Sequence, residues 1–517
     1  MPDQPTNNRT IARNTLMLYG RALLMMLIGL YTSRVILHTL GITDFGIYNA
    51  VGGIIGLFGV VTGSLSNATS RFITVAIGKG DQEITNKTFG NIKVIYYALC
   101  FLVVILGETI GLWFLYHKMT IPADRMTAAF WIYQFTIVSA VLNFICIPYN
   151  SAIIAHEKMS AFAYISLLDA VFKLLICYLL IVIPFDKLIV YSTLIFCVGI
   201  VDRIIYAIYC ERRFEEVKAK PRIFRKQFRE IVVLSGWALS GNIAYVSYTQ
   251  GLNILLNIFF GPVVNAARGV ALQVQGVIGQ FVSNFQTAIN PQITKSYAAG
   301  NFERMHQLFN FSSKYSFFLL FFLSLPVVIE APYILGLWLV KVPQHTVSFL
   351  RIIFVYEWVQ TLAGAYNTSV LATGNMKWFQ IVDGIIRLSI FPSCYVLLKF
   401  FNEQPESVFV VLAISEVFSV TAKTFIVLPM IHYKKVDYLK EVIFPIIAIF
   451  LLSSVVPILI IGIMKTSFVR LVCVVLTSWG GTSFFIWNIG LNKHEKLAIK
   501  DMIIHKLLIK IGLVHDK

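Results

Sequence analysis

The stretch YGRALLMMLIGLYTSRVILHTLGITDFGIYNAV, residues Tyr19–Val51, indicates the class of fold. An apolar run long enough to cross a bilayer leads through a short glycine-containing turn into a second apolar run. Arg21 and Arg34 interrupt the first run, although lipid rejects charged side chains. The stretch therefore predicts membrane helices on which some side chains face water or a charged partner.

Similar apolar runs extend along the whole chain. The sequence is 57% hydrophobic and 13% charged, with a mean hydropathy of +0.75, so most of its 517 residues belong in a membrane. We predict an all-α polytopic membrane protein with about fourteen transmembrane helices. The predicted spans are residues 14–36, 44–67, 93–116, 127–149, 160–183, 188–209, 231–258, 264–288, 314–338, 347–371, 378–400, 407–430, 443–464 and 468–490.

Basic residues are unevenly divided between the two sides of the membrane that these spans define. With the N-terminus inside, 28 of the 43 Lys and Arg residues fall on inner loops and termini, and seven fall on outer loops. The positive-inside rule therefore places both termini in the cytoplasm. The strongest cluster, ERRFEEVKAKPRIFRKQFRE at residues 211–230, is interpreted as an orientation signal that also meets anionic headgroups. Nucleic acid is not expected as a partner.

The sequence lacks recognisable patterns for catalysis or metal binding. Its seven cysteines lie in or beside apolar runs at irregular spacings, which predicts neither disulfides nor metal ligands. No GxxxxGK[ST], HExxH or GxSxG pattern occurs, so we predict no catalytic residue, metal site or cofactor. The polar start, MPDQPTNNRT, also argues against a cleaved signal peptide.

The chain repeats itself at an offset near 220 residues. Four segments match in the same order: residues 64–83 with 284–303, 110–114 with 335–339, 149–159 with 366–376, and 169–174 with 383–388. Each repeat holds six spans, and an even number gives both halves the same orientation. Parallel repeats of this kind are typical of transporters whose substrate path runs between two lobes.

We therefore predict two parallel six-helix lobes around a central cavity, plus two extra C-terminal helices. The predicted parts are an N-lobe (residues 1–210, spans 1–6), a basic cytoplasmic linker (211–230), a C-lobe (231–432, spans 7–12), spans 13–14 (433–492) and a basic amphipathic cytoplasmic tail (493–517).

Acidic residues within spans are the available sites for a coupling cation. Asp169 with Lys173, and Asp383 with Arg387, form i,i+4 pairs at equivalent places in the two repeats. Each pair is consistent either with packing inside its lobe or with coupling to a cation. Our candidates for ion coupling are Asp169, Asp383 and Glu330, with H⁺ or Na⁺ as the ion.

Three arginines inside spans differ from these pairs. The repeat partners of Arg21, Arg34 and Arg268 are Gly241, Ile254 and Tyr48, and no acidic residue lies at helical spacing within their own spans. Either acids on other spans neutralise them, or they face a cavity that admits an anion. Arg21 lies nearer the cytoplasmic entrance, where it would serve initial capture.

Amide and aromatic side chains accompany these arginines at helical periodicity. A water-filled cavity for an anion bearing hydroxyl groups explains both features, because guanidinium groups grip phosphate bidentately and amides suit sugar hydroxyls. The candidate substrate-binding residues on spans 1, 7 and 8 are Arg21, Tyr31, Arg34, His38, Asn242, Tyr245, Asn253, Asn265, Arg268, Gln275 and Gln286.

The segment SRVILHTLGITDFGIYNAV, together with AIGKGD at the end of span two and YNSAIIAHEK at the end of span four, resembles a known family. It is similar to the bacterial polysaccharide-repeat flippases of the O-antigen type, within the multidrug/oligosaccharidyl-lipid/polysaccharide exporter superfamily. Arg34 matches an arginine before the first loop of the related lipid II flippase. An acid follows that arginine in the relative, whereas Val35 stands here, which puts a coupled acid–base role in doubt.

The resemblance implies two lobes around a V-shaped cavity lined chiefly by spans 1, 2, 7 and 8. It implies a flippase that moves an undecaprenyl-diphosphate-linked oligosaccharide repeat unit to the outer leaflet of the bacterial inner membrane by alternating access. Lipopolysaccharide or O-antigen synthesis is the implied pathway class, and polysaccharide polymerase and assembly proteins are the implied partners. Spans 13–14 would offer a groove for the lipid tail.

Two other functions are consistent with parts of the sequence. Glu108, Glu330 and Glu357 are consistent with a multidrug or cation antiporter of the same fold. The unpaired arginines within spans argue against it, because they would repel a cationic substrate. A membrane glycosyltransferase or polymerase needs a sizeable soluble loop with catalytic acids. The outer loops here are short and the largest inner loop is basic, which argues against an enzyme.

Overall fold

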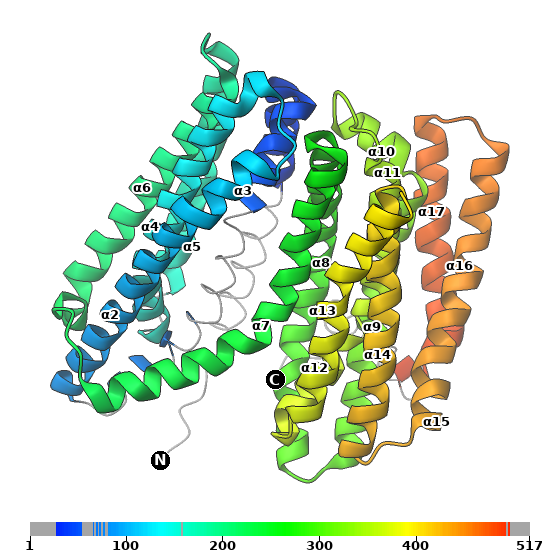
Figure 1. Ribbon diagram of the computed structural model, residues 1–517. Helices are drawn as coiled ribbons and strands as arrows, with labels where there is room; N and C mark the ends of the chain where they lie inside the picture. The colour runs from blue at the N-terminus through cyan, green and yellow to red at the C-terminus, as the bar shows by residue number, and fades with distance from the viewer. Residues whose placement is uncertain are drawn as a thin grey trace, which may run out of the picture. The chain divides into compact units, whose positions relative to one another are not determined.

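The computed structural model describes residues 27–53, 66, 69–70, 72–73, 76–77, 81–156, 159–492 and 495–496 (Figure 1). Within these ranges the regular elements are all helices, which confirms the predicted fold class. Eight of the described helices are long and apolar enough to cross a membrane. The predicted tail helix and most of span two lie outside the described residues.

Where the structure describes the predicted spans, helices occupy them, and several are longer than predicted. Residues 27–53 are helical, with Gly41 at a φ of +83° where the first span turns into the second. The labelled helices are α2 (Gln82–Leu106), α3 (Leu112–His117), α4 (Met126–Ala155), α5 (Met159–Val182), α6 (Lys187–Arg213), α7 (Arg225–Phe260), α8 (Pro262–Ala298), α9 (Phe302–Ile329), α10 (Ala331–Trp338), α11 (Thr346–Gln360), α12 (Ala363–Thr373), α13 (Lys377–Phe400), α14 (Glu406–Met430), α15 (Lys435–Tyr438), α16 (Phe444–Ile463) and α17 (Phe468–Phe485).

The chain forms two compact units. The first contains residues 1–270, 338–346 and 387–408, and the second contains the remaining residues from 271 onward. In the first unit α4 packs against α2, α5 and α6 (Figure 1). In the second unit α9 packs against α12, α16 and α17. The predicted boundaries of the lobes, linker and tail stay a prediction.

Two glycines bring α2 and its continuation close to α4. Residues Gly107–Gly111 form a π-helical turn, and the Tyr133 hydroxyl donates a 2.7 Å hydrogen bond to the Gly107 carbonyl. A Cβ at Gly111 would lie 2.0 Å from that hydroxyl, and a Cβ at Gly107 would lie 2.9 Å from Ile137. Only glycine allows this approach, which buries Tyr133 in the core of the first unit.

The internal repeat extends to the way its helices begin. The Asp81 carboxylate accepts hydrogen bonds from the Glu83 and Ile84 amides and caps α2. Asn301, its partner at an offset of 220 residues, accepts from the Arg304 amide and caps α9. Both helices therefore start one residue after the matching cap, because aspartate and asparagine satisfy the free amides of a first helical turn equally well.

Charged contacts attach α17 and the residues after it to α9. Glu330, which is fully buried, accepts from Arg470 Nε at 2.7 Å and from Arg470 Nη2 at 2.8 Å. Near the middle of α9, the buried Lys314 ammonium donates to the Gly490 carbonyl at 3.0 Å and pairs with Glu495 at 3.3 Å. Two charged contacts thus attach the last predicted span and the residues after it to α9, one near the middle of that helix and one directly after its last residue.

Candidate functional site

Arg268 lies near the start of α8 and is partly buried. Its Nη1 donates to the Asn253 side-chain oxygen at 3.2 Å, and its Nη2 donates to the Thr249 carbonyl at 2.8 Å. Its buried Nε has no hydrogen-bond partner. Within the described part of the chain no acidic residue forms an ion pair with it. The guanidinium thus retains unused donors, and of the two alternatives that the sequence left open the described residues show no neutralising acid.

Two asparagines hold Arg268 in position. The Asn265 side-chain amide donates to both the backbone carbonyl and the side-chain oxygen of Asn253, each at 2.7 Å. Asn253 in turn donates to the Asn49 carbonyl at 3.1 Å. A Cβ at Gly53 would lie 2.0 Å from the Asn253 amide, so this junction needs glycine there. Asn253 and Asn265 therefore position the guanidinium, a role that the periodicity of the sequence did not reveal.

Arg34 lies on an exposed face of the helical segment 27–53. Tyr31, Arg34 and His38 are all exposed along this face, as their spacing predicted. In the described residues Arg34 makes neither an ion pair nor a hydrogen bond, whereas Tyr31 approaches the Tyr178 hydroxyl at 3.5 Å. Arg21 lies outside the described residues.

Arg34 and Asn49, the residue that contacts Asn253 beside Arg268, lie at similar distances along the helix from the Gly41 turn. Arg34 precedes Gly41 by seven residues and Asn49 follows it by eight, which corresponds to about 10–12 Å of helix on either side. Arg268 follows Pro262, the first residue of α8, by six residues.

The turn that carried the family resemblance has a structural role. Asp44 pairs with Arg125, and the same guanidinium pairs with Asp186 at 2.7 Å. Asp186 also caps α6. A Cβ at Gly46 would lie 1.9 Å from the Pro262 carbonyl oxygen, so glycine is needed where this turn meets the start of α8. The motif fixes the ends of several helices and does not itself present a binding group.

Candidate residues further along α8 make contacts within the second unit. The Gln275 amide donates to the Glu357 carboxylate at 2.7 Å. The Gln286 amide donates to the Ser316 hydroxyl and to the Thr361 carbonyl, each at 3.0 Å. These contacts join α8 to α9 and α11. The candidates Asn242 and Tyr245 lie on α7, where the structure does not describe their side chains.

Each of the three coupling candidates has a cationic partner, and two of them, Asp383 and Glu330, are paired with a residue on another helix. Asp383 accepts from the Lys423 ammonium at 2.9 Å and from the Ser419 hydroxyl at 2.6 Å. Lys423 lies on α14 and is only 2% exposed. Glu330 is held by Arg470 through both of its oxygens. The contact with Lys423 was not predicted, because the sequence suggested only Arg387, one turn further along α13.

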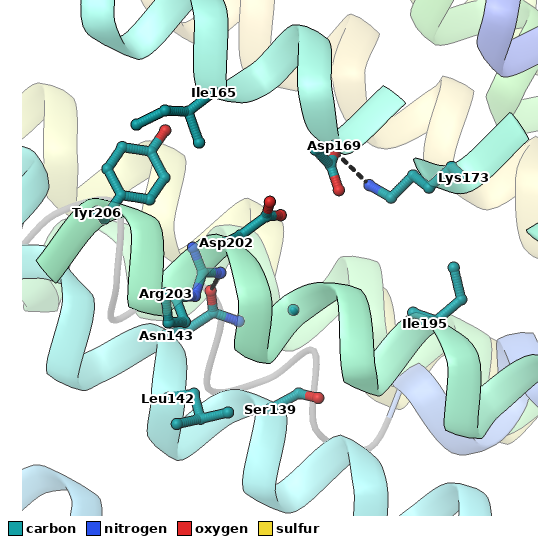
Figure 2. Close-up of a pocket in the computed structure, with 11 residues that line it drawn as sticks. Ser139, Leu142, Asn143, Ile165, Asp169, Lys173, Ile195, Asp202, Arg203 and Tyr206 are labelled. Carbon is teal, nitrogen blue, oxygen red and sulfur yellow. Dashed lines mark hydrogen bonds and ion pairs between the residues drawn. The ribbon is translucent and has the colours of Figure 1, made fainter. Parts of the chain in front are cut away.

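The third candidate, Asp169, lies in a charged cavity between α4, α5 and α6. The cavity has a volume of about 340 Å³, and its lining residues include Asp169, Lys173, Asp202 and Arg203 (Figure 2). The Lys173 ammonium and the Asp169 carboxylate are 2.7 Å apart, which confirms the predicted i,i+4 pair. The Arg203 guanidinium donates to the Asn143 side-chain oxygen.

Asp202 is the least satisfied acid of this cavity. It is 8% exposed and its Oδ1 atom has no hydrogen-bond partner in the described part of the chain. Its carboxyl group lies next to that of Asp169, and Figure 2 shows it between Asp169 and Arg203. The cavity is roomy and polar enough for water molecules. Asp169 lies on α5 and Asp202 on α6, so the sequence alone did not place the two side by side.

Comparison with protein families gives the context for these sites. The model of the family described as polysaccharide biosynthesis protein matches residues 11–308. The chain belongs to this family. The predicted family resemblance is thereby confirmed, although the match does not name a sugar. A comparison with curated proteins finds no match.

Solved structures with a similar fold are membrane transporters. The chain superposes on "Lipid II flippase MurJ, inward closed conformation" with a TM-score of 0.69, at 14% identity over 91% of this chain and 98% of that one. It is similar to an inward-facing multidrug resistance MATE family transporter of the MOP superfamily, with a TM-score of 0.60 and 14% identity over 80% and 94% of the two chains. A MOP superfamily transporter from Pyrococcus furiosus gives a TM-score of 0.51 at 14% identity over 80% and 95%. These matches establish the fold.

Proposed function

We propose that this protein is a flippase that moves an undecaprenyl-diphosphate-linked oligosaccharide repeat unit from the cytoplasmic to the outer leaflet of the bacterial inner membrane by alternating access. Arg268 carries the proposal, because it is a partly buried guanidinium whose buried Nε has no hydrogen-bond partner and which the described residues leave without a carboxylate partner. A charge in such a place is costly unless a counter-ion approaches it. The diphosphate supplies that counter-ion while cargo is bound.

The chemistry of the diphosphate fits the donors at this site. Arginine has five N–H donors in a fixed plane, and Arg268 directs two of its nitrogens to Asn253 and Thr249. The remaining donors can bond phosphate oxygens, and Arg34 adds an exposed guanidinium at a similar depth from the Gly41 turn. The family description and the fold shared with the lipid II flippase support a lipid-linked saccharide as the cargo.

The experiment that tests this function measures cargo on the outer leaflet. Purified protein is reconstituted with undecaprenyl-diphosphate-linked oligosaccharide carrying a fluorescent sugar, and a membrane-impermeant periodate treatment reports the fraction that has crossed. We expect protein-dependent exposure of the sugar and no protein-dependent accumulation of dye cations. Dye accumulation without sugar exposure would instead establish the multidrug antiporter, the function named for a relative of the same fold.

We further propose that export is coupled to H⁺ through Asp169 and Asp202. Asp383, Glu330 and Asp169 are each paired with a cation, whereas one oxygen of Asp202, beside Asp169, has no hydrogen-bond partner in the described residues. The cavity in the first unit also holds Lys173 and Arg203, whose charges disfavour Na⁺. Two adjacent carboxyl groups readily share a proton, because one of them then becomes a donor to the other. The other polar side chains that line the cavity are Ser139 and Asn143 on α4 and Tyr206 on α6.

Replacing Asp202 with asparagine should separate export from the proton gradient. We expect export by wild-type protein in vesicles to increase with an imposed pH gradient and to ignore a Na⁺ gradient. Asp202→Asn should show export that no longer responds to the pH gradient, because the proton-sharing pair is lost. Asp383→Asn is the matched control and should keep the response, since its carboxylate is neutralised by Lys423. An unchanged pH response in Asp202→Asn would rule out this carboxyl pair.

A further inference from the structure

The segment between α6 and α7, residues 214–224, lies fixed on the end of the first unit. We call it the strap. The Phe214 ring stacks on the His156 ring with 4.1 Å between centroids, and Glu216 pairs with His156 at 2.6 Å. The strap is a short, charge-rich connection between two helices, yet three of its side chains are buried: Phe214, Glu216 and Val217. Apolar and ionic contacts therefore hold one side of the strap against α4 and α6.

The α2 helix holds the backbone of the strap. The Lys93 ammonium donates to the Val217 carbonyl at 2.6 Å and to the Ala219 carbonyl at 3.1 Å. The Phe224 amide donates to the Asn91 side-chain oxygen at 2.7 Å. A Cβ at Gly90 would lie 2.9 Å from the Lys220 carbonyl oxygen, so glycine allows the strap to lie directly on α2.

The opposite side of the strap presents positive charge. The exposed basic side chains of the strap and the adjacent helix ends are Arg212, Arg213, Lys218, Lys220, Arg222, Arg225 and Arg229. Within the described residues none of them forms an ion pair, and only Glu211 and Glu215 are exposed acids in this stretch. Ile223 is 55% exposed beside these charges. The α6 helix is a candidate membrane span, so we expect its end with the strap to lie at the level of the lipid headgroups.

A role in membrane orientation does not explain this construction. The positive-inside rule depends on the number of Lys and Arg residues in a loop, and a loop of any conformation satisfies it. Here Gly90, Asn91, Lys93 and His156 fix the backbone, so that the basic side chains stand in a defined arrangement. A preorganised set of donors is what recognition of phosphate oxygens requires.

We propose that the strap is a binding site for the anionic headgroups of phospholipids in the leaflet beside it. Arginine and lysine bond the phosphate oxygens, and the exposed Ile223 enters the apolar margin of the headgroup region. The bound lipid ties the first unit to the membrane surface. The proposal concerns membrane lipid rather than cargo, and it stands whether or not the exported molecule is a saccharide.

The test uses the full-length protein in lipid nanodiscs without cargo. Native mass spectrometry measures how much phosphatidylglycerol remains bound after exchange into phosphatidylcholine. The variant Lys218→Gln, Lys220→Gln, Arg222→Gln keeps the anchoring residues and four exposed arginines. We expect it to lower retention of phosphatidylglycerol by about tenfold or more. The matched control, Arg304→Gln, Lys377→Gln, Lys434→Gln, removes three exposed charges from the second unit and should retain the lipid.

A second variant separates an ordered strap from charge alone. Gly90→Ala removes no charge, but its Cβ displaces the strap from α2, so retention of phosphatidylglycerol should fall several-fold. Retention equal to wild type in either the triple variant or Gly90→Ala would overturn the proposal. So would an equal loss in the control, because binding would then follow net charge. Release of strap-bound lipid by inorganic pyrophosphate at low concentration would identify a diphosphate as the true occupant and would also overturn it.

Discussion

Replacing Arg268 with alanine should reduce export about 10- to 100-fold while the protein remains in the membrane at its normal abundance. The expected loss corresponds to about 1.5–3 kcal/mol, the contribution of charge-assisted hydrogen bonds to a phosphate. Abundance should hold because the change leaves no carboxylate without its counter-ion, and Asn253 still accepts from Asn265. The periodate assay for outward-facing sugar measures the rate, and quantitative immunoblotting of membranes measures the abundance.

Two further substitutions sharpen this test. Arg268→Lys should restore export only in part, because an ammonium keeps the charge but loses the planar pair of donors. Arg268→Glu should impair export more than alanine does, because it repels an anionic cargo. Normal export by an Arg34→Ala, Arg268→Ala double variant at normal abundance would contradict the proposal that these guanidinium groups bind the cargo.

Replacing Arg470 with alanine should have the opposite pattern, with a large loss of stability. Glu330 is fully buried and would be left as an unpaired charge, which typically costs about 3–5 kcal/mol. We expect a lower melting temperature for the purified protein and depletion from membranes. Scanning fluorimetry in detergent measures the first effect, and immunoblotting measures the second.

A double variant separates stability from coupling at this pair. Glu330→Gln, Arg470→Met removes both charges together, so much of the lost stability should return. If Glu330 serves only the α9–α17 contact, the double variant should export cargo with the wild-type response to ion gradients. Loss of that response with restored stability would reinstate Glu330 as a coupling site.

Features that depend on local sequence or on repetition were predictable. The apolar runs gave the helices, and the repeat aligned residues that cap α2 and α9 in the same way. The comparison of repeats also singled out Arg268, because its partner Tyr48 is uncharged and its own span lacks acids. A cation without a local acid is visible from sequence when the helical period is known.

Partners distant in the chain could not be predicted. Arg470 follows Glu330 by 140 residues, and neither belongs to a repeated motif that would connect them. The same limit applies to Asp383, whose contact with Lys423 depends on how α13 packs on α14. Asn253 was read as a cargo contact because it lies on a polar stripe. A stripe does not show whether an amide faces a cavity or a neighbouring side chain.

The contacts between α9 and the last two spans also limit how this protein could lose those spans during evolution. A chain ending after α14 would keep Glu330 and Lys314 buried, yet it would lack Arg470, the Gly490 carbonyl and Glu495. Deletion of the last spans would thus leave two charges of opposite sign, one near the middle of α9 and one directly after it, without their partners. Shorter descendants of this protein should therefore arise only after both positions have become neutral.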